Sequence, residues 1–291
     1  MHALNIIGCG KVGKTLGTLF LTKGLVSSVT IVNRSAQSGS DAVSFLGSAQ
    51  YVTDLQQLPP ARVWMIAAPD KELPAISRQL ASLTALNPEA LVFHCCGSKD
   101  SSLLSALEGK TSKRASLHLI RSFADPAATA ASFDGTYCGI EGSPEATSEL
   151  SALMTAVGAT VFPISAEATL LCHIGHVFAS NYLVVILDCA RTLYSQAAIP
   201  EGIAKACMHS IVEGTLRNIA SLGTTQALTG PIVRGECELL QEHLSALRAM
   251  PHPALLQLYT TLAQGALEIA KERSDVELDT IAALREIVAK Y

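Results

Sequence analysis

Short apolar runs rich in β-branched residues alternate with helical segments over the first half of the chain. This alternation is typical of a mostly parallel sheet covered by helices on its faces. The strands that it predicts are Leu4–Ile7, Val29–Val32, Val63–Ala67, Leu91–His94, Tyr137–Ile140 and Thr160–Phe162. We therefore expect an α/β domain with a doubly wound sheet over residues 1–164.

The pattern changes at Ser165, where the β-branched runs give way to long segments rich in alanine and leucine. It predicts an all-α domain over residues 165–291, which begins with a helix from Ser165 to Gln196. The apolar stretch Tyr182–Leu187 is far shorter than the ~20 residues of a membrane span, so we interpret it as a buried helix and expect no membrane contact.

Composition supports two globular domains in these 291 residues. Hydrophobic residues make up 49% of the chain and charged residues 16%, which excludes a disordered chain. The net charge is -4, and no basic run suggests a nucleic-acid partner. The eight cysteines show no Cys-x-x-Cys pair, and no export signal is evident, so we expect free thiols in the cytoplasm.

A glycine-rich turn follows the first predicted strand and opens a helix. Its residues are Gly8, Cys9, Gly10, Lys11, Val12 and Gly13. In this context the three glycines provide a tight turn, a close approach of pyrophosphate to the backbone, and close packing of helix on strand. The segment therefore predicts a Rossmann domain that binds a dinucleotide at the helix N-terminus.

The end of the second strand indicates which dinucleotide is bound. An NAD site usually places an acid there, whereas this chain has Asn33, Arg34 and Ser35, and residues 1–40 contain no Asp or Glu. A cationic, hydroxyl-bearing segment would attract a 2′-phosphate. We expect NADP in preference to NAD; the alternative makes Arg34 a solvated loop cation.

Two later strand ends should face the same crevice, because ligands of doubly wound sheets bind outside the carboxyl ends of the strands. We expect Ala68, Pro69 and His94 to contact the cofactor. Ordinary turn chemistry is the alternative at each position.

Polar residues cluster in the otherwise apolar first helix of the second domain. His173, His176 and Ser180 share a helix face, and Asn181 borders it. Polar groups in such a stripe need partners, which a substrate could supply, although a hydrogen-bonded core histidine is the alternative. We expect His173, with His176 second, to act as acid/base and Ser180 with Asn181 to orient substrate. Without an acid nearby, no metal site is expected.

The segment Thr229–Glu236 contains two glycines and a proline that restrict its backbone. Arg234 could clamp a substrate carboxylate, or it could pair with Glu236.

Taken together, these motifs resemble the Rossmann-like oxidoreductases that carry a C-terminal domain of unknown function, relatives of pyrroline-5-carboxylate reductase, ketopantoate reductase and 6-phosphogluconate dehydrogenase. The residues that carry the resemblance also include Leu117-His118 and Leu228-Thr229-Gly230-Pro231 with Arg234-Gly235. The chain departs from the family pattern at Cys95, Cys96, Leu119, Cys172 and Glu236.

The resemblance implies an NAD(P)-dependent reductase or dehydrogenase that is a homodimer through its helical domain. It also implies a small-molecule site between residues 94–125 and 173–181, which brings His118 to the substrate. The leading hypothesis is hydride transfer between NADP and a small polar carbonyl or imine. The alternative is a non-catalytic dinucleotide-binding sensor or scaffold dimer.

Overall fold

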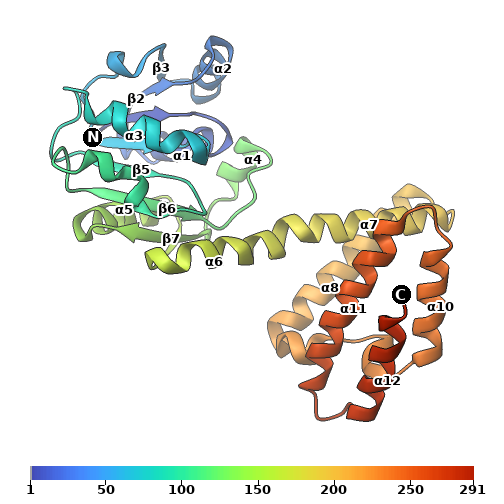
Figure 1. The fold of residues 1–291 in the computed structure, drawn as a ribbon. Helices are drawn as coiled ribbons and strands as arrows, with labels where there is room; N and C mark the ends of the chain where they lie inside the picture. Colours follow the sequence, from blue (N-terminus) through green and yellow to red (C-terminus); the bar gives the residue numbers. More distant parts are fainter. Residues whose placement is uncertain (1) are drawn as a thin grey trace. The chain divides into compact units, whose positions relative to one another are not determined.

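The computed structural model describes residues 2–291 (Figure 1). Contacts divide the chain into two compact units, one that ends at Asn181 and one that spans Tyr182–Tyr291. Helix α6 (Ala166–Val177) is grouped by these contacts with the sheet, although its composition resembles that of the helices that follow. The two units are described separately below.

The first unit contains a sheet of order β3-β2-β1-β4-β5-β6-β7-β8. The strands are β1 (His2–Ile7), β2 (Val26–Val32), β3 (Ala49–Val52), β4 (Val63–Ile66), β5 (Leu91–His94), β6 (Arg114–Leu119), β7 (Tyr137–Gly142) and β8 (Thr160–Pro163). All neighbours pair in parallel except β6 and β7. The expected α/β fold with a mostly parallel sheet is confirmed, while β3 and β6 were not among the predicted strands.

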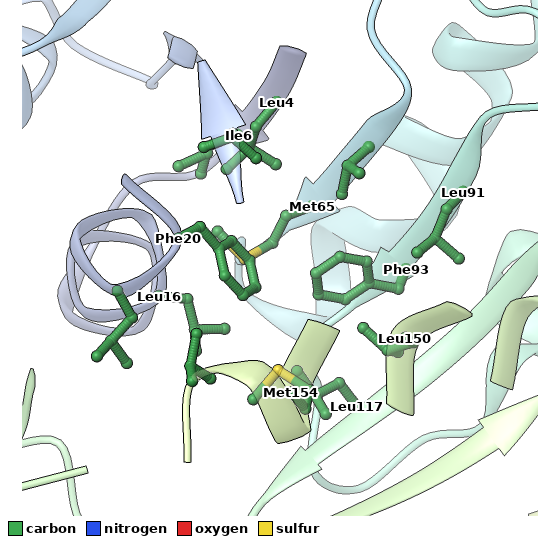
Figure 2. Close-up of a cluster of buried hydrophobic side chains, with 14 of the residues drawn as sticks. Leu4, Ile6, Leu16, Phe20, Met65, Leu91, Phe93, Leu117, Leu150 and Met154 are labelled. Carbon is green, nitrogen blue, oxygen red and sulfur yellow. The ribbon is translucent and has the colours of Figure 1, made fainter. Parts of the chain in front are cut away.

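Alternating side chains of each strand build two separate cores. Leu4 and Ile6 of β1 belong to one cluster and Ile7 to the other, as expected for a period of two. The first cluster joins β1, β4, β5 and β6 to helices α1 (Lys11–Thr22) and α5 (Pro144–Ala156), as Figure 2 shows. The second packs against α3 (Leu73–Ala81) and the 3-10 helix η3 (Ser101–Leu107). The sheet is thus covered on both faces. Shorter elements complete this unit: α2 (Ala36–Leu46), α4 (Pro126–Ala131), η1 (Leu55–Gln57) and η2 (Asp70–Glu72).

The strand order reverses its direction beside β1, because β2 and β3 lie on one side and β4 on the other. At such a switch point the connections leave toward opposite faces and open a crevice outside the carboxyl ends of the strands. The glycine-rich turn leaves the carboxyl end of β1 and therefore lies at this crevice.

The second unit is helical, as expected. Its helices are α7 (Leu183–Gln196), α8 (Glu201–Ala227), α9 (Pro231–Arg234), α10 (Cys237–Arg248), α11 (Pro253–Lys271) and α12 (Leu278–Ala289). Its core is formed by α9 to α12 around Leu240, Leu244, Leu267 and Leu284. Over its 27 residues α8 buries only Ala204, so this long helix lies largely outside that core.

The predicted first helix of the second half is present but interrupted. It begins where expected, because the Ser165 side chain accepts the amide N–H of Ala168 as an N-cap. A π-helical segment, η4 (Phe178–Tyr182), separates α6 from α7.

By length and composition, Ala166–Gln196 is the one described helix that could cross a membrane, and its most apolar window has a mean hydropathy of 1.8. The expectation that Tyr182–Leu187 is buried is wrong for a single copy of the chain, because Val184 is 66% exposed. Its neighbours Tyr182 and Val185 are each 50% exposed. An apolar composition alone does not reveal whether the chain itself supplies the covering surface.

Candidate functional site

A cavity of about 860 Å³ lies at the carboxyl ends of β1, β2 and β4. This volume is within the range of small-molecule sites in proteins. The residues expected to bind a cofactor that line it are Gly8, Cys9, Gly10, Val12, Asn33, Arg34, Ser35, Ala68 and Pro69. Lys14, Ser38, Asp41 and Cys95 also line it and were not predicted.

The three glycines of the turn have different surroundings. A Cβ at Gly8 would lie 2.8 Å from the Ala68 nitrogen, and its φ of +84° favours glycine. A Cβ at Gly13 would lie 3.2 Å from the Gly8 oxygen, so the helix packs closely on the strand. A Cβ at Gly10 would meet nothing within 4 Å. Open space at the second glycine, between two crowded ones, is what the approach of a pyrophosphate requires.

The N-terminus of α1 supplies donors at this place. Amides in the first turn of a helix have no carbonyl in their own helix to bond, and among the described residues no side chain caps α1. The partial positive charge of the helix N-terminus favours an anion there. The residues Lys11, Val12 and Gly13 form this first turn. A diphosphate therefore fits the chain's own donor groups.

Asn33 joins the glycine-rich turn to the start of α2. Its Oδ1 accepts the amide N–H of Cys9 at 2.6 Å, and its Nδ2 donates to the Ser38 oxygen at 2.9 Å. Both ends of the side-chain amide are thus used within the protein. Asn33 lines the cavity, and its side chain stabilises the backbone of the cavity wall. The sequence instead predicts a direct contact between Asn33 and the cofactor.

The far end of the cavity carries a cation and hydroxyls. Arg34 is exposed, and Ser35 caps α2 by accepting the amide N–H of Ser38. The Ser35 and Ser38 hydroxyls lie 3.0 Å apart. Asp41, the first acid in the sequence, also lines the cavity from α2. This end therefore combines the expected positive charge with one carboxylate that the sequence pattern did not place there.

His94 lies away from the lining of the cavity. Its ring is fully buried, Nδ1 accepts the amide N–H of Cys96 at 3.2 Å, and Nε2 lies 2.9 Å from the Asp100 oxygen. Burial lowers the pKa of this imidazole, which keeps it neutral. Contact between His94 and a cofactor, as expected from its position at a strand end, would require the loss of these bonds.

His118 holds the same loop from the next strand. Its ring is 2% exposed, Nδ1 lies 2.9 Å from the Gly97 oxygen, and Nε2 lies 3.0 Å from the Ser116 hydroxyl. Burial lowers its pKa as well. Both ring nitrogens have protein partners, so the expected contact with substrate would displace one of them.

The polar stripe of the first long helix lies partly against this loop. His173 Nδ1 lies 3.1 Å from the position of a Cβ at Gly97. His176 Nε2 lies 3.5 Å from the Cys172 sulfur, and burial followed by the nearby His173 lowers the pKa of His176. Ser180 is exposed and falls in η4. Because a π-helix changes the angular step between residues, the helix face predicted for His173, His176 and Ser180 is not continuous.

Arg234 lies in the second unit on the short helix α9. Its guanidinium donates two hydrogen bonds to Glu236, at 2.8 and 2.9 Å. The local turn is tight, because a Cβ at Gly235 would lie 2.8 Å from the Thr280 methyl. The structure thus shows the ion-pair alternative for Arg234, and its contact with substrate stays a prediction.

Within residues 2–291, no group of three or more histidine, cysteine, aspartate or glutamate side chains is arranged to hold a metal ion.

Two family models match adjoining parts of the chain. The model described as "Rossmann-like domain" matches residues 2–118, and "Domain of unknown function (DUF2520)" matches residues 136–266. The chain belongs to the Rossmann-like proteins that carry a DUF2520 domain. This finding confirms the family expected from the motifs.

The DUF2520 region begins in the sheet of the first unit and ends in α11. The contact boundary instead falls at Asn181. The division at residue 164 that composition suggests stays a prediction.

Solved structures share this fold. BF3122 from Bacteroides fragilis, described as a candidate NADP oxidoreductase, has a TM-score of 0.75 at 21% identity, covering 93% of this chain and 98% of that chain. TM1727 from Thermotoga maritima has a TM-score of 0.69 at 22% identity, covering 92% of this chain and 98% of that chain. A pyrroline-5-carboxylate reductase from Coxiella burnetii has a TM-score of 0.56 at 15% identity, covering 99% of this chain and 96% of that chain. At these identities the similarity shows the fold alone. No curated protein matches the sequence.

The two buried histidines predict a loss of stability in mild acid. Burial lowers the pKa of His94 and of His118 below the usual 6.5, which both regain on unfolding. Below pH 6.5 the unfolded chain therefore binds more protons, so the stabilisation is complete above pH 6.5 and is lost as the pH falls. We expect the free energy of unfolding to decrease by up to about 1.4 kcal/mol per pH unit for each ring.

Chemical denaturation at pH 7.5, 6.5 and 5.5 measures this slope. His118→Asn should reduce it, whereas His252→Gln, a change at an exposed histidine, should not. Constant stability across this interval would contradict the prediction.

Proposed function

We propose that the protein is an NADP-dependent oxidoreductase that transfers hydride between the nicotinamide and a small polar carbonyl or imine substrate. The observation that carries this proposal is the glycine-rich turn at the cavity, with open space at Gly10 between the crowded Gly8 and Gly13. The descriptions of BF3122 as an NADP oxidoreductase and of the Coxiella burnetii protein as a reductase support this class of activity.

The residues that would hold the cofactor fall into two groups. The first-turn amides of α1 would bind the diphosphate, and Arg34 with Ser35 would bind the adenosine end. Ala68, Pro69 and Cys95 would border the nicotinamide half, because they line the cavity from β4 and β5. When bound, the nicotinamide supplies or accepts the hydride.

NADP is favoured over NAD by the charge at the end of β2. Arg34 and Ser35 offer a guanidinium and a hydroxyl to a 2′-phosphate, and neither Asn33 nor its neighbours provides the acid typical of a ribose hydroxyl contact. Asp41 lies a full helical turn into α2, where it could bind a ribose or brace a cation.

The acid/base role is proposed for His173, with His176 as second candidate. The His173 ring lies next to Gly97 in the loop after β5. The same loop contains Cys95, which lines the cavity. An imidazole can donate a proton near neutral pH to a carbonyl or imine as hydride arrives. Ser180 and Asn181, both exposed, would orient the polar substrate.

A homodimer is part of the proposal. Ile203, Ile211 and Leu222 of α8 are all more than half exposed and lie within about 100° of one another around the helix, an apolar stripe that soluble monomers rarely leave uncovered. The same helix carries the ion pair Glu213–Arg217, so its surface suits a second protein copy in water better than a lipid. All eight cysteines are free, which supports a cytoplasmic location.

Removal of the Arg34 guanidinium should weaken the binding of NADPH more than that of NADH. A charge-assisted hydrogen bond contributes about 1.5–3 kcal/mol, so Arg34→Ala should raise the Kd for NADPH about 10- to 100-fold. The Kd for NADH should change little, and Lys23→Ala, at the far end of α1, should affect neither. Calorimetry measures both affinities. Equal losses for the two cofactors would contradict NADP selectivity, and no binding of either would overturn the proposed function.

Turnover should depend on His173. Across a panel of 2-oxo acids and imines, the protein should oxidise NADPH, and His173→Ala should lower kcat about 10²- to 10⁴-fold, the usual loss of a general acid, with unchanged Kd for NADPH. His209→Ala, at an exposed position of α8, is the control. NADPH binding without oxidation, with a deazaflavin also offered as acceptor, would favour the sensor or scaffold alternative.

A charge on the exposed face of α8 should separate the dimer. Ile211 is 66% exposed, and burial of a lysine at an interface costs several kcal/mol unless it is paired. Light scattering at micromolar concentration should therefore give a dimer for the native chain and a monomer for Ile211→Lys. Ala220→Lys, also exposed and on the polar face of α8 seven residues after Glu213, should remain dimeric. A monomeric native chain would contradict the proposal.

A further inference from the structure

Three buried side chains, none of which lines the cavity, support the loop after β5. His94 ends β5, and Ser116 and His118 lie on the neighbouring strand β6. The exposed fractions of these side chains are 0%, 0% and 2%. Buried polar groups are costly unless they are bonded, so their partners should reveal what they do.

Every partner outside this trio is a backbone group of the loop. Nδ1 of His94 accepts the N–H of Cys96, and its Nε2 faces the Asp100 oxygen at 2.9 Å. The Ser116 hydroxyl donates to the Lys99 oxygen at 2.9 Å. Nδ1 of His118 faces the Gly97 oxygen at 2.9 Å. The backbone is thus fixed at four positions from Cys96 to Asp100.

Two carboxylates from other elements also hold this segment. Ser98 donates to the Asp70 carboxylate at 3.0 Å, and Glu141 accepts both the N–H and the hydroxyl of Ser101, at 2.6 and 2.9 Å. Gly97 has no side chain to take part in these bonds. Its missing side chain leaves room for the His173 ring, 3.1 Å from where a Cβ would lie.

We propose that His118 is a positioning residue, which acts through the carbonyl of Gly97 to hold this backbone against His173. Together with His94 and Ser116 it forms a polar platform beneath the loop. The platform sets the distance between the candidate acid and the cavity that Cys95 lines from the same loop.

The partners also fix opposite proton positions on the two rings. A carbonyl only accepts, so the neutral His118 ring must carry its proton on Nδ1, which leaves Nε2 as an acceptor that competes with the Lys99 oxygen for the Ser116 proton. The Cys96 N–H only donates, so His94 must carry its proton on Nε2. The Ser116 hydroxyl has one proton and two acceptors, Nε2 of His118 and the Lys99 oxygen.

Nitrogen NMR of the full chain, labelled at histidine and measured at pH 7.5 without cofactor, tests the platform directly. We expect the Nδ1–H tautomer for His118 and the Nε2–H tautomer for His94, with the signals assigned through His118→Asn. The Nε2–H tautomer at His118, or the same tautomer on both rings, would overturn the proposal.

Conservative and disruptive variants separate positioning from bulk packing. The amide nitrogen of His118→Asn can replace Nδ1 as a donor to Gly97, whereas His118→Leu cannot. Hydrogen exchange of the amides from Gly97 to Ser101 should rise about 5-fold or more in His118→Leu, as for one lost hydrogen bond. It should stay within about 2-fold in His118→Asn. Equal effects of the two variants would overturn the proposal.

Should His118→Leu fail to fold, Ser116→Ala provides the same test, because it removes the bond to Lys99 with little change in volume. Faster exchange at Lys99 to Ser101 supports the platform, and unchanged exchange contradicts it.

A kinetic comparison extends the test to the reaction and rests on the proposed function. His118→Leu should lower kcat up to about 100-fold, the loss typical of a misplaced reacting group, while the Kd for NADPH stays unchanged. His118→Asn should recover most of that loss. A higher Kd with unchanged kcat would contradict a positioning role. If the native chain shows no turnover, the proposed function fails while the NMR and exchange results still decide the platform.

Discussion

The close approach of Gly8 to the backbone of Ala67 and Ala68 is the contact on which the cavity depends. Strands β1 and β4 are hydrogen-bonded neighbours, and their chains separate just past this point. A side chain at Gly8 would collide with backbone atoms that cannot rotate away. Because Gly8 has none, β1 can turn directly into α1, and the unbonded amides of that helix open onto the cavity.

A second constraint acts one strand farther along the sheet. The loop after β5 passes over buried imidazole and hydroxyl groups, and in a low-dielectric interior each of their bonds is stronger than it would be in water. The backbone from Cys96 to Asp100 therefore has few alternative conformations. The site thus depends on a glycine without a side chain at the end of β1 and on buried polar side chains beside the loop after β5.

The sequence predicted the elements whose cause is local. Glycine spacing located the dinucleotide turn, Ser165 marked a helix start, and composition separated sheet from helices. Strand β6 escaped prediction because Ser116 and His118 break its apolar pattern. These residues are tolerated there because the loop supplies distant partners, which no periodicity reveals. For the same reason the strand positions of His94 and His118 predict ligand contacts, whereas the structure gives both rings partners in the loop after β5. The exposure of α7 and α8 was also not predictable, since it depends on what covers them.

The π-helical turn at Phe178–Tyr182 has a consequence for how such a protein can change over evolution. Hydrogen bonds in a π-turn span five residues where those of an α-turn span four, so the turn accommodates one additional residue over nearly the same rotation. Loss of one residue here would therefore restore regular α-helical winding. His173 and His176 precede the irregularity, whereas Ser180 and Asn181 lie within it. A single-codon deletion would thus change which polar side chains the turn presents and leave the two histidines as they are.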